Sequence, residues 1–337
     1  MWSLPRGSRG AWQVWGALAA CSAVVLALAV SIGSVALPAG TLWRALTDPG
    51  TVPGTDLQVL QLRVPRVVAA YATGGLLAVS GALMQVLLVN PLADPYILGV
   101  SGGAAVGALS LLYLGVSGMP LELGALAGAL IALLLVLAPA HRLFRADGGR
   151  LVATRLLLTG VVLAAGWSAL ISLLLTLAPE AALRGMLFWL MGDLGAVQHW
   201  EWPLAALLLL LLAVQPLARD LNSLLRGEIQ AFSLGVPVAR RRLQLYLLAS
   251  LAAAVAVSTA GTIGFVGLLV PHLVRLLVGN DQRVLLPATA LLGGSLLTLA
   301  DTGARTLFAP AQLPVGVITA LIGVPVFLWL LTRRPGS

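Results

Sequence analysis

The chain has 337 residues, of which 59% are hydrophobic and only 9% are charged, whereas about 25% of the residues in a soluble globular domain are charged. This composition excludes an ordinary soluble enzyme or binding module and predicts an all-α protein that crosses a membrane many times. The formal net charge of +8 does not indicate nucleic-acid binding, because all 20 basic residues are arginines and most of them flank apolar runs.

Apolar runs predict ten membrane-spanning helices in a single domain that covers residues 1–337. The first run is too long for the apolar part of a signal peptide, so it is predicted to be an uncleaved span. The first half of the domain is expected at about 57–177, a polar central segment at about 219–241 and the second half at about 242–332. The predicted spans cover about 13–37, 64–88, 94–116, 119–139, 152–177, 203–217, 242–260, 262–279, 284–303 and 313–332.

The arginines indicate how these spans are oriented. With ten spans both ends of the chain lie on one side of the membrane, and most arginines fall on that side, including those of the central segment. The positive-inside rule places this side in the cytoplasm. The opposite side carries only Arg44, Arg63, Arg66, Arg184 and Arg305.

The central segment, Arg219 to Arg242, has no apolar run of the roughly 20 residues that a membrane-spanning helix needs, so it is predicted to lie in water. Leu221 and Leu224 recur at helical spacing, as do Ile229 and Phe232, before a Gly-Val-Pro break. The segment therefore predicts two short amphipathic helices whose apolar faces need a partner.

The two halves of the chain share a faint repeat. Gly81 and Pro91 close the run AVSGALMQVLLVNP, and Gly261 and Pro271 have the same spacing in VSTAGTIGFVGLLVP. The predicted topology sends the two copies through the membrane in opposite directions. This pattern is typical of transporters built from inverted repeats.

Several catalytic motifs are absent from the sequence. Because the chain has no lysine, it contains no P-loop, and it has no H-E-x-x-H metalloprotease motif. Most carboxylates, including Asp193 and Asp301, lie near predicted helix ends, which argues against a proton-coupled carrier with acids at mid-membrane. Asp94 precedes Pro95 and is explained as the N-cap of a helix.

Arg63 and Arg66, in the run LRVPR, allow two interpretations. Arginines at the membrane surface often extend their side chains to water without any further role. Both residues nevertheless lie on the side where arginine is disfavoured, and Arg305 is predicted on the same side. A cluster of exposed guanidinium groups would suit pairing with the carboxylates of a docking protein. The residues alone favour neither interpretation.

With these features assembled, the chain from about residue 57 to 332 closely resembles the permease subunits of the FecCD family, which are type II ABC importers for cobalamin, haem and ferric siderophores. The segments that carry the resemblance are LRVPRVVAAYATGGLLAVSGALMQVLLVNPLADPYILGVSGGAA, LFWLMGDLG, LGVPVARRR, TIGFVGLLVPHLVRLLVGNDQRVLLP and LPVGVITALIGVPVFLWLL.

The resemblance implies an inverted-repeat permease in a bacterial inner membrane, with both termini cytoplasmic and a homodimer as the functional form. It implies two copies of a cytoplasmic ABC ATPase, which would hold ATP and Mg, and a periplasmic substrate-binding protein. It implies no enzymatic activity, cofactor or metal in this chain itself. The cargo would be haem, cobalamin or a ferric siderophore, and Arg184 favours haem.

The resemblance also assigns roles to individual residues. The translocation path would run at the dimer axis along the fifth and tenth spans, and the connection at 141–154 would help to close its cytoplasmic end. The expected ATPase-coupling residues are Arg226, Glu228, Leu234, Gly235, Val236 and Arg240. The expected contacts for the binding protein are Arg63, Arg66 and Arg305. The expected path residues are Thr159, Gly160, Ser168, Arg184, Thr319 and Gly323.

Two other classes stay open at this point. A proton-coupled secondary transporter would move its cargo without an ATPase. An intramembrane hydrolase would need a Ser or His constellation at depth, which the scattered Ser168, Ser172 and His272 do not provide. Copurification with a P-loop ATPase would distinguish an importer subunit from both.

Overall fold

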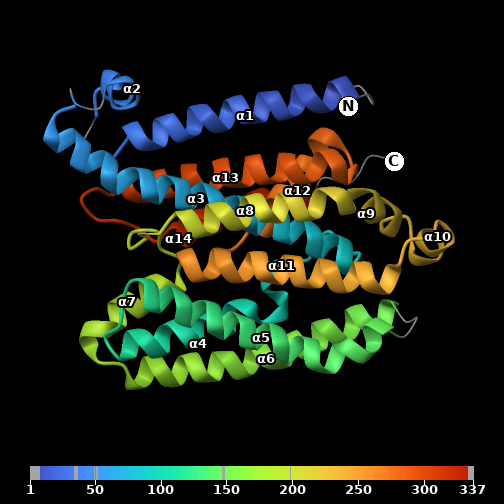
Figure 1. The fold of residues 1–337 in the computed structure, drawn as a ribbon. Coiled ribbons are helices and arrows are strands. Elements are labelled where there is room, and N and C mark those ends of the chain that lie inside the picture. The colour runs from blue at the N-terminus through green and yellow to red at the C-terminus, as the bar shows by residue number, and fades with distance from the viewer. Residues whose placement is uncertain are drawn as a thin grey trace.

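The computed structural model describes residues 8–33, 37–48, 50, 52–145, 149–197 and 199–332, and every regular element in these ranges is a helix. Figure 1 shows that the long helices run roughly parallel or antiparallel to one another. The elements are α1 (Ser8–Ser31), α2 (Ala39–Thr47), α3 (Gly54–Leu87), η2 (Pro95–Leu98), α4 (Val100–Tyr113), α5 (Met119–Arg145), α6 (Gly149–Leu177), α7 (Glu180–Leu190), α8 (Glu201–Val214), η3 (Gln215–Leu217), α9 (Ala218–Leu224), α10 (Glu228–Ser233), α11 (Val238–Ala260), α12 (Val266–Val278), α13 (Gln282–Thr306) and α14 (Val315–Thr332).

The all-helical membrane architecture predicted from the sequence is confirmed. Each of the ten predicted spans coincides with a helix of its own. Within the described ranges, seven stretches are long and apolar enough to cross a membrane, whereas α4, α12 and α14 are shorter apolar helices. The number of spans therefore stays a prediction. The seven stretches are Gly10–Ser31, Gly54–Leu87, Met119–Pro139, Thr154–Leu177, Glu201–Leu224, Val238–Ala260 and Gln282–Thr306.

The second predicted span begins earlier than expected. It was predicted from residue 64, but α3 starts at Gly54 and has 34 residues. At a rise of 1.5 Å per residue it is about 50 Å long and exceeds the hydrocarbon core of about 30 Å. Hydropathy detects only the apolar part of such a helix, so the polar first turns, with Asp56, were missed.

The short helices α4 and α12 follow irregular segments that lie inside the protein. Ala93, before α4, and Ile263, before α12, are both buried. Irregular backbone is tolerated at membrane depth only when protein surrounds it. The two segments meet where the Ile263 N–H donates to the Tyr96 hydroxyl at 3.2 Å. As predicted, Asp94 caps η2, since its carboxylate accepts from the Tyr96 N–H at 2.8 Å.

The packing of the helices supports the inverted repeat. Helix α3 packs against α13 and α12, and α11 makes the corresponding contacts with α5 and α4. Figure 1 shows that α3 and α11, which also contact each other, run in opposite directions. The two copies of the sequence motif meet directly, because a Cβ at Gly81 would lie 1.8 Å from the Gly267 carbonyl oxygen.

This contact gives a prediction for stability. The substitution Gly81→Ala is expected to lower the free energy of unfolding by about 1–3 kcal/mol, because the α3 and α12 backbones would have to separate. Thermal unfolding in detergent would measure the loss. Gly166→Ala is the matched control, since nothing lies within 4 Å of its added Cβ. Equal behaviour of the two variants would contradict the close packing.

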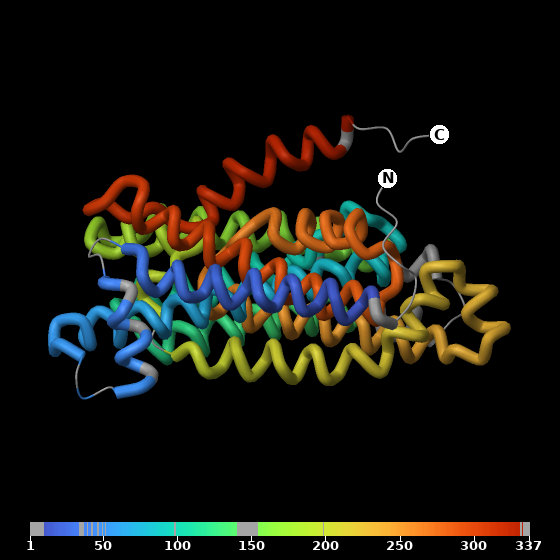
Figure 2. Tube along the Cα trace, turned by 90° about the horizontal axis from the view of Figure 1, so that it is seen from above, coloured from blue at the N-terminus to red at the C-terminus, as the bar shows by residue number. Residues whose placement is uncertain are grey.

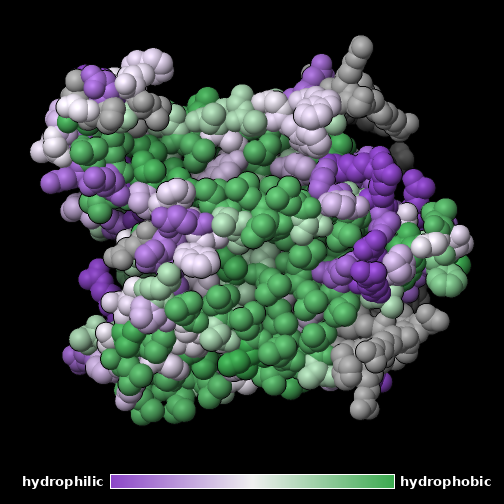
Figure 3. Space-filling view, viewed as in Figure 1, coloured by the Kyte–Doolittle hydropathy of each residue, from purple (hydrophilic) through white to green (hydrophobic). Residues whose placement is uncertain are grey.

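The two ends of the bundle differ in what they carry. Helix α1 begins and α14 ends at the end that bears α9 and α10, whereas α2 and α7 lie at the opposite end (Figures 1 and 2). We refer to these as the α10 end and the α7 end. Between them the surface is broadly apolar (Figure 3). Figure 2 also shows α14 leaning away from the other helices toward the α10 end.

Candidate functional site

The α10 end carries two short helices joined by tight turns. Gly227, before α10, has φ of 117°, and Gly235, after it, has φ of 78°. These left-handed values cost glycine little and strain any other residue. Leu221 and Leu224 of α9 are buried, as is Ala231 of α10. The prediction of two short helices in the central segment is confirmed.

Three large apolar side chains of this segment face outward. Ile229 is 87% exposed, Phe232 is 74% exposed and Leu234 is 66% exposed. These three residues form what we call the α10 patch. The patch belongs to the central segment that the sequence predicts to lie in water. Exposed apolar groups gathered in this way mark an interaction surface.

The α9–α10 unit is tied to the start of α11 by two ion pairs. Arg241 Nε lies 2.5 Å from Asp220 Oδ2, and the Arg242 guanidinium pairs with the Glu228 carboxylate. Arg242 is buried, whereas the Glu228 side chain is 37% exposed, so the second pair lies at the edge of the protein. The two ion pairs therefore join the α9–α10 unit to α11 through side chains as well as through the connecting backbone.

The predicted coupling residues divide into two groups. Arg226, Leu234, Gly235 and Arg240 are exposed. Val236 is buried instead, so its side chain packs inward and does not project toward a partner. Glu228 pairs with Arg242, as described above, and holds α10 in place.

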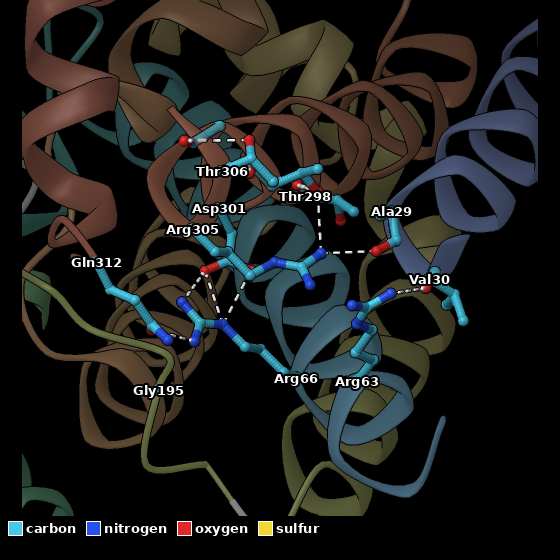
Figure 4. Close-up of polar contacts among 12 residues, drawn as sticks. Ala29, Val30, Arg63, Arg66, Gly195, Thr298, Asp301, Arg305, Thr306 and Gln312 are labelled. Carbon is cyan, nitrogen blue, oxygen red and sulfur yellow. Dashed lines mark hydrogen bonds and ion pairs between the residues drawn. The ribbon is translucent and has the colours of Figure 1, made fainter. Parts of the chain in front are cut away.

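At the α7 end, Asp301 lies at the centre of an arginine cluster (Figure 4). Arg66 Nη2 donates to Asp301 Oδ1 at 2.8 Å and Arg66 Nε donates to the same oxygen at 3.0 Å. Arg305 Nε lies 3.3 Å from Asp301 Oδ2, and Arg66 Nη1 donates to Gln312 Oε1 at 2.9 Å. Asp301 is only 1% exposed, so this is a buried carboxylate neutralised by guanidinium groups.

Arg63 and Arg305 also cap helix α1. The last carbonyls of a helix lack intrahelical partners, and cations are favoured there. Arg63 Nη1 donates to the carbonyls of Val30 and Ser31, both at 3.1 Å, and Arg305 Nη2 donates to the Ala29 carbonyl at 2.6 Å. Figure 4 shows both guanidinium groups turned toward α1.

The expectation of three exposed arginines is therefore wrong in its premise. Arg63 and Arg305 are each only 7% exposed, because their charge is used inside the subunit to hold α1 against α3 and α13. The Arg66 side chain is 11% exposed, against 8% for that of Arg305, and it bonds the exposed Gln312. Of the three, Arg66 is the residue best placed to meet another protein.

The six expected path residues do not form one surface of the subunit. Ser168 on α6 and Arg184 on α7 are exposed, and Thr159 is partly exposed. The others are buried: Gly160, Thr319 and Gly323. A Cβ at Gly323 would lie 2.6 Å from the Phe265 side chain, so this glycine serves close packing. The connection at 141–154 was expected to close the path, and its side chains from 141 to 153 lie outside the described residues.

Arg184 lines a cavity of about 480 Å³ at the α7 end, together with Glu122 and Asp193. Its guanidinium carbon lies 5.6 Å from the centre of the Phe188 ring. Neither acidic residue was assigned to a site from the sequence, where Asp193 was placed near a helix end and Glu122 near the start of the fourth predicted span. Ile229 and Phe232 of the α10 patch were likewise not assigned to the coupling set, although their helical spacing was the signal.

Comparison with known proteins places the chain among transport proteins. Residues 21–333 match the FecCD transport family. The vitamin B12 import system permease protein BtuC of Shigella boydii serotype 18 is 43% identical over 317 residues, which cover 93% of this chain and 94% of that protein. The BtuC protein of Escherichia coli O17:K52:H18 is 42% identical over the same extent.

Two solved structures have a similar fold. The first is an inward-facing conformation of a metal-chelate type ABC transporter, with a TM-score of 0.80 and 31% identity over 96% of this chain and 100% of that one. The second is PsaBC from Streptococcus pneumoniae in complex with Fab, with a TM-score of 0.57 and 19% identity over 83% of this chain and 95% of that one. The second similarity concerns the fold alone.

Proposed function

The chain belongs to the FecCD transport family and is the permease subunit of an ABC importer, and we propose that its cargo is a corrinoid of the vitamin B12 type. In this class of importer a separate ATPase subunit hydrolyses ATP and a binding protein delivers the substrate. The observation that carries the choice of cargo is the 43% identity to a vitamin B12 permease over 93% of the chain. This similarity outweighs the single residue, Arg184, that favoured haem.

We propose that the ATPase binds the α10 patch. An exposed apolar patch on a water-facing helix fits the apolar core of a protein interface. Movement of the ATPase would displace α10, and the Glu228–Arg242 and Asp220–Arg241 pairs would transmit that displacement to α11. Since α11 packs on α3 and α5 in the core, the movement reaches both halves of the permease. Arg226, Gly235 and Arg240 lie around the patch in this scheme.

The path is proposed to form between two copies of the chain. A cargo of corrinoid size needs a wide passage, and no large apolar channel is required within one subunit. The outward face of α14 carries Leu321, Ile322, Leu328 and Trp329, all exposed, and α14 leans away from the bundle (Figure 2). A second copy would cover this face and bring its own α14 and α6 to the shared axis, where Thr159 and Ser168 would border the path.

The α7 end is proposed to face the periplasm and to receive the binding protein. Arg66 would pair with a carboxylate of that protein, while Arg63 and Arg305 keep α1 and the cluster in place. The α10 end, where α1 begins and α14 ends, then faces the cytoplasm, in accordance with the positive-inside rule.

The alternative of a proton-coupled carrier has less support. Among the described residues, Asp301 is the most deeply buried carboxylate within a predicted span, and it is paired with Arg66 and Arg305. Both oxygens of this carboxylate are engaged by guanidinium groups inside the subunit, so it is not open to a path through the membrane.

The cargo can be tested with the assembled importer. The permease, its ATPase and its binding protein in proteoliposomes are expected to hydrolyse ATP faster when cyanocobalamin is added, and to accumulate it inside the vesicles. Haem and a ferric siderophore are the comparison ligands. If only one of these two stimulated hydrolysis and uptake, the assignment of a corrinoid cargo would be wrong.

A further inference from the structure

A groove of about 990 Å³ lies between α8 and α13 near the α10 end. Its size is at the upper limit of the range of about 300–1,000 Å³ that is usual for ligand sites. The walls are apolar and include Leu208, Leu211 and Leu212 of α8 and Pro287 of α13. Leu208 is 54% exposed and Leu212 is 72% exposed, so the groove opens onto the apolar face of the bundle, which contacts the bilayer.

Two arginines line this groove at its end nearest to α9. Arg219, at the start of α9, and Arg283, at the start of α13, both line it, and both are exposed. Gln215 of η3, which precedes α9, is bonded to the start of α13, since its Nε2 donates to the Arg283 carbonyl at 3.0 Å. Figure 3 shows hydrophilic side chains gathered at this end of the apolar surface.

The nearby carboxylates are engaged elsewhere. Asp220 pairs with Arg241. Asp281 caps α13 by accepting from the Arg283 backbone N–H at 3.1 Å, and it also accepts from Asn222 Nδ2 at 2.8 Å. Of these two carboxylates only Asp220 is neutralised by an ion pair, and neither lines the groove, so the two lining guanidinium groups face the single negative charge of Asp281 and leave a net positive charge.

We propose that this groove binds an anionic membrane phospholipid. Its phosphodiester would pair with Arg219 and Arg283 at the membrane surface, and an acyl chain would lie along the α8 leucines. Arginine is suited to phosphate because its fork of donors can bind two oxygens at once. Basic pockets between membrane helices are known to select anionic lipid headgroups in this way.

The geometry favours a lipid over a soluble phosphate. The charged groups occupy one end only, and the rest of the groove offers apolar walls that a free phosphate or a nucleotide cannot use. An amphiphile matches both parts: its headgroup meets the arginines and its acyl chain meets the apolar walls. Each methylene group of the buried chain adds favourably to the free energy of binding. The inference depends only on the chain spanning a membrane and is independent of the identity of the cargo.

Native mass spectrometry of the permease purified with its ATPase partner tests the proposal. The wild-type complex is expected to retain phosphatidylglycerol in preference to phosphatidylcholine. Arg219→Ala/Arg283→Ala should weaken the binding of phosphatidylglycerol about 25-fold, because each arginine contributes about fivefold, and should leave the binding of phosphatidylcholine unchanged. Leu212→Trp should weaken the binding of both lipids, because the indole fills the groove while both charges remain.

Matched variants and soluble probes decide the outcome. Arg155→Ala removes another exposed arginine, on α6, that does not line the groove, and should have no effect. Arg219→Lys/Arg283→Lys should restore most of the preference. Equal retention by the wild type and the double alanine variant would overturn the proposal. So would equal losses in Arg155→Ala, or displacement of the lipid by inorganic phosphate or glycerophosphate at millimolar concentration.

Discussion

The double substitution Ile229→Asp/Phe232→Asp is expected to abolish the association between this permease and its ATPase. Both side chains are mostly exposed and belong to the α10 patch, which we propose as the ATPase contact. Apolar anchors at the centre of an interface each contribute about 2 kcal/mol or more, so the loss of both should weaken binding at least about 100-fold. Surface plasmon resonance with the permease in nanodiscs would measure this change.

The controls separate loss of contact from loss of fold. Ile229→Val/Phe232→Leu keeps the patch apolar and should retain association within about tenfold. Because the native side chains are exposed, the thermal stability of the aspartate variant should match that of the wild type. An aspartate variant that folds normally and binds the ATPase with unchanged affinity would show that the partner binds elsewhere.

The second large effect is expected at Asp301. Asp301→Ala should lower the free energy of unfolding by about 3–5 kcal/mol, because it leaves the guanidinium groups of Arg66 and Arg305 close together without their shared carboxylate. The loss should also loosen α1, since Arg305 donates to the Ala29 carbonyl. Thermal unfolding in detergent would measure the stability, and hydrogen exchange would report on the end of α1.

Asp281 provides the matched comparison on the same helix. Asp281→Ala removes an exposed N-cap and should cost only about 1 kcal/mol. The double variant Asp301→Leu/Arg305→Met should recover part of the loss, because it replaces part of a buried ionic network with apolar groups of similar size. If Asp301→Ala and Asp281→Ala were equally destabilised, the cluster would not be a buried network.

Hydropathy and helical spacing were sufficient to predict much of the fold. The apolar runs located a helix for each predicted span, and the spacing of Leu221, Leu224, Ile229 and Phe232 predicted α9 and α10. The same method overestimated α12, which was predicted from residue 262 but begins at Val266. The reason is physical: the irregular residues before this helix are apolar because protein surrounds them, so hydropathy cannot distinguish them from helix.

The environment of the arginines could not be predicted from local sequence. Arg66 and its partner Asp301 are 235 residues apart, and nothing in either segment indicates that they meet. Arg63 and Arg305 were expected to be exposed because arginine on the external side is unusual. Both instead donate to backbone carbonyls at the end of α1, which every helix offers and which leave no trace in the sequence, and Arg305 also pairs with Asp301. Val236 illustrates the same limit, since its burial depends on how α10 packs.

The permease is proposed to be driven by its ATPase through the α10 patch. The most direct test is uptake of cyanocobalamin by proteoliposomes that contain the complete importer, with and without ATP. Accumulation should require ATP and should stop in the Ile229→Asp/Phe232→Asp variant. Accumulation by vesicles that contain the permease without the ATPase, at the rate of the complete importer, would contradict the claim.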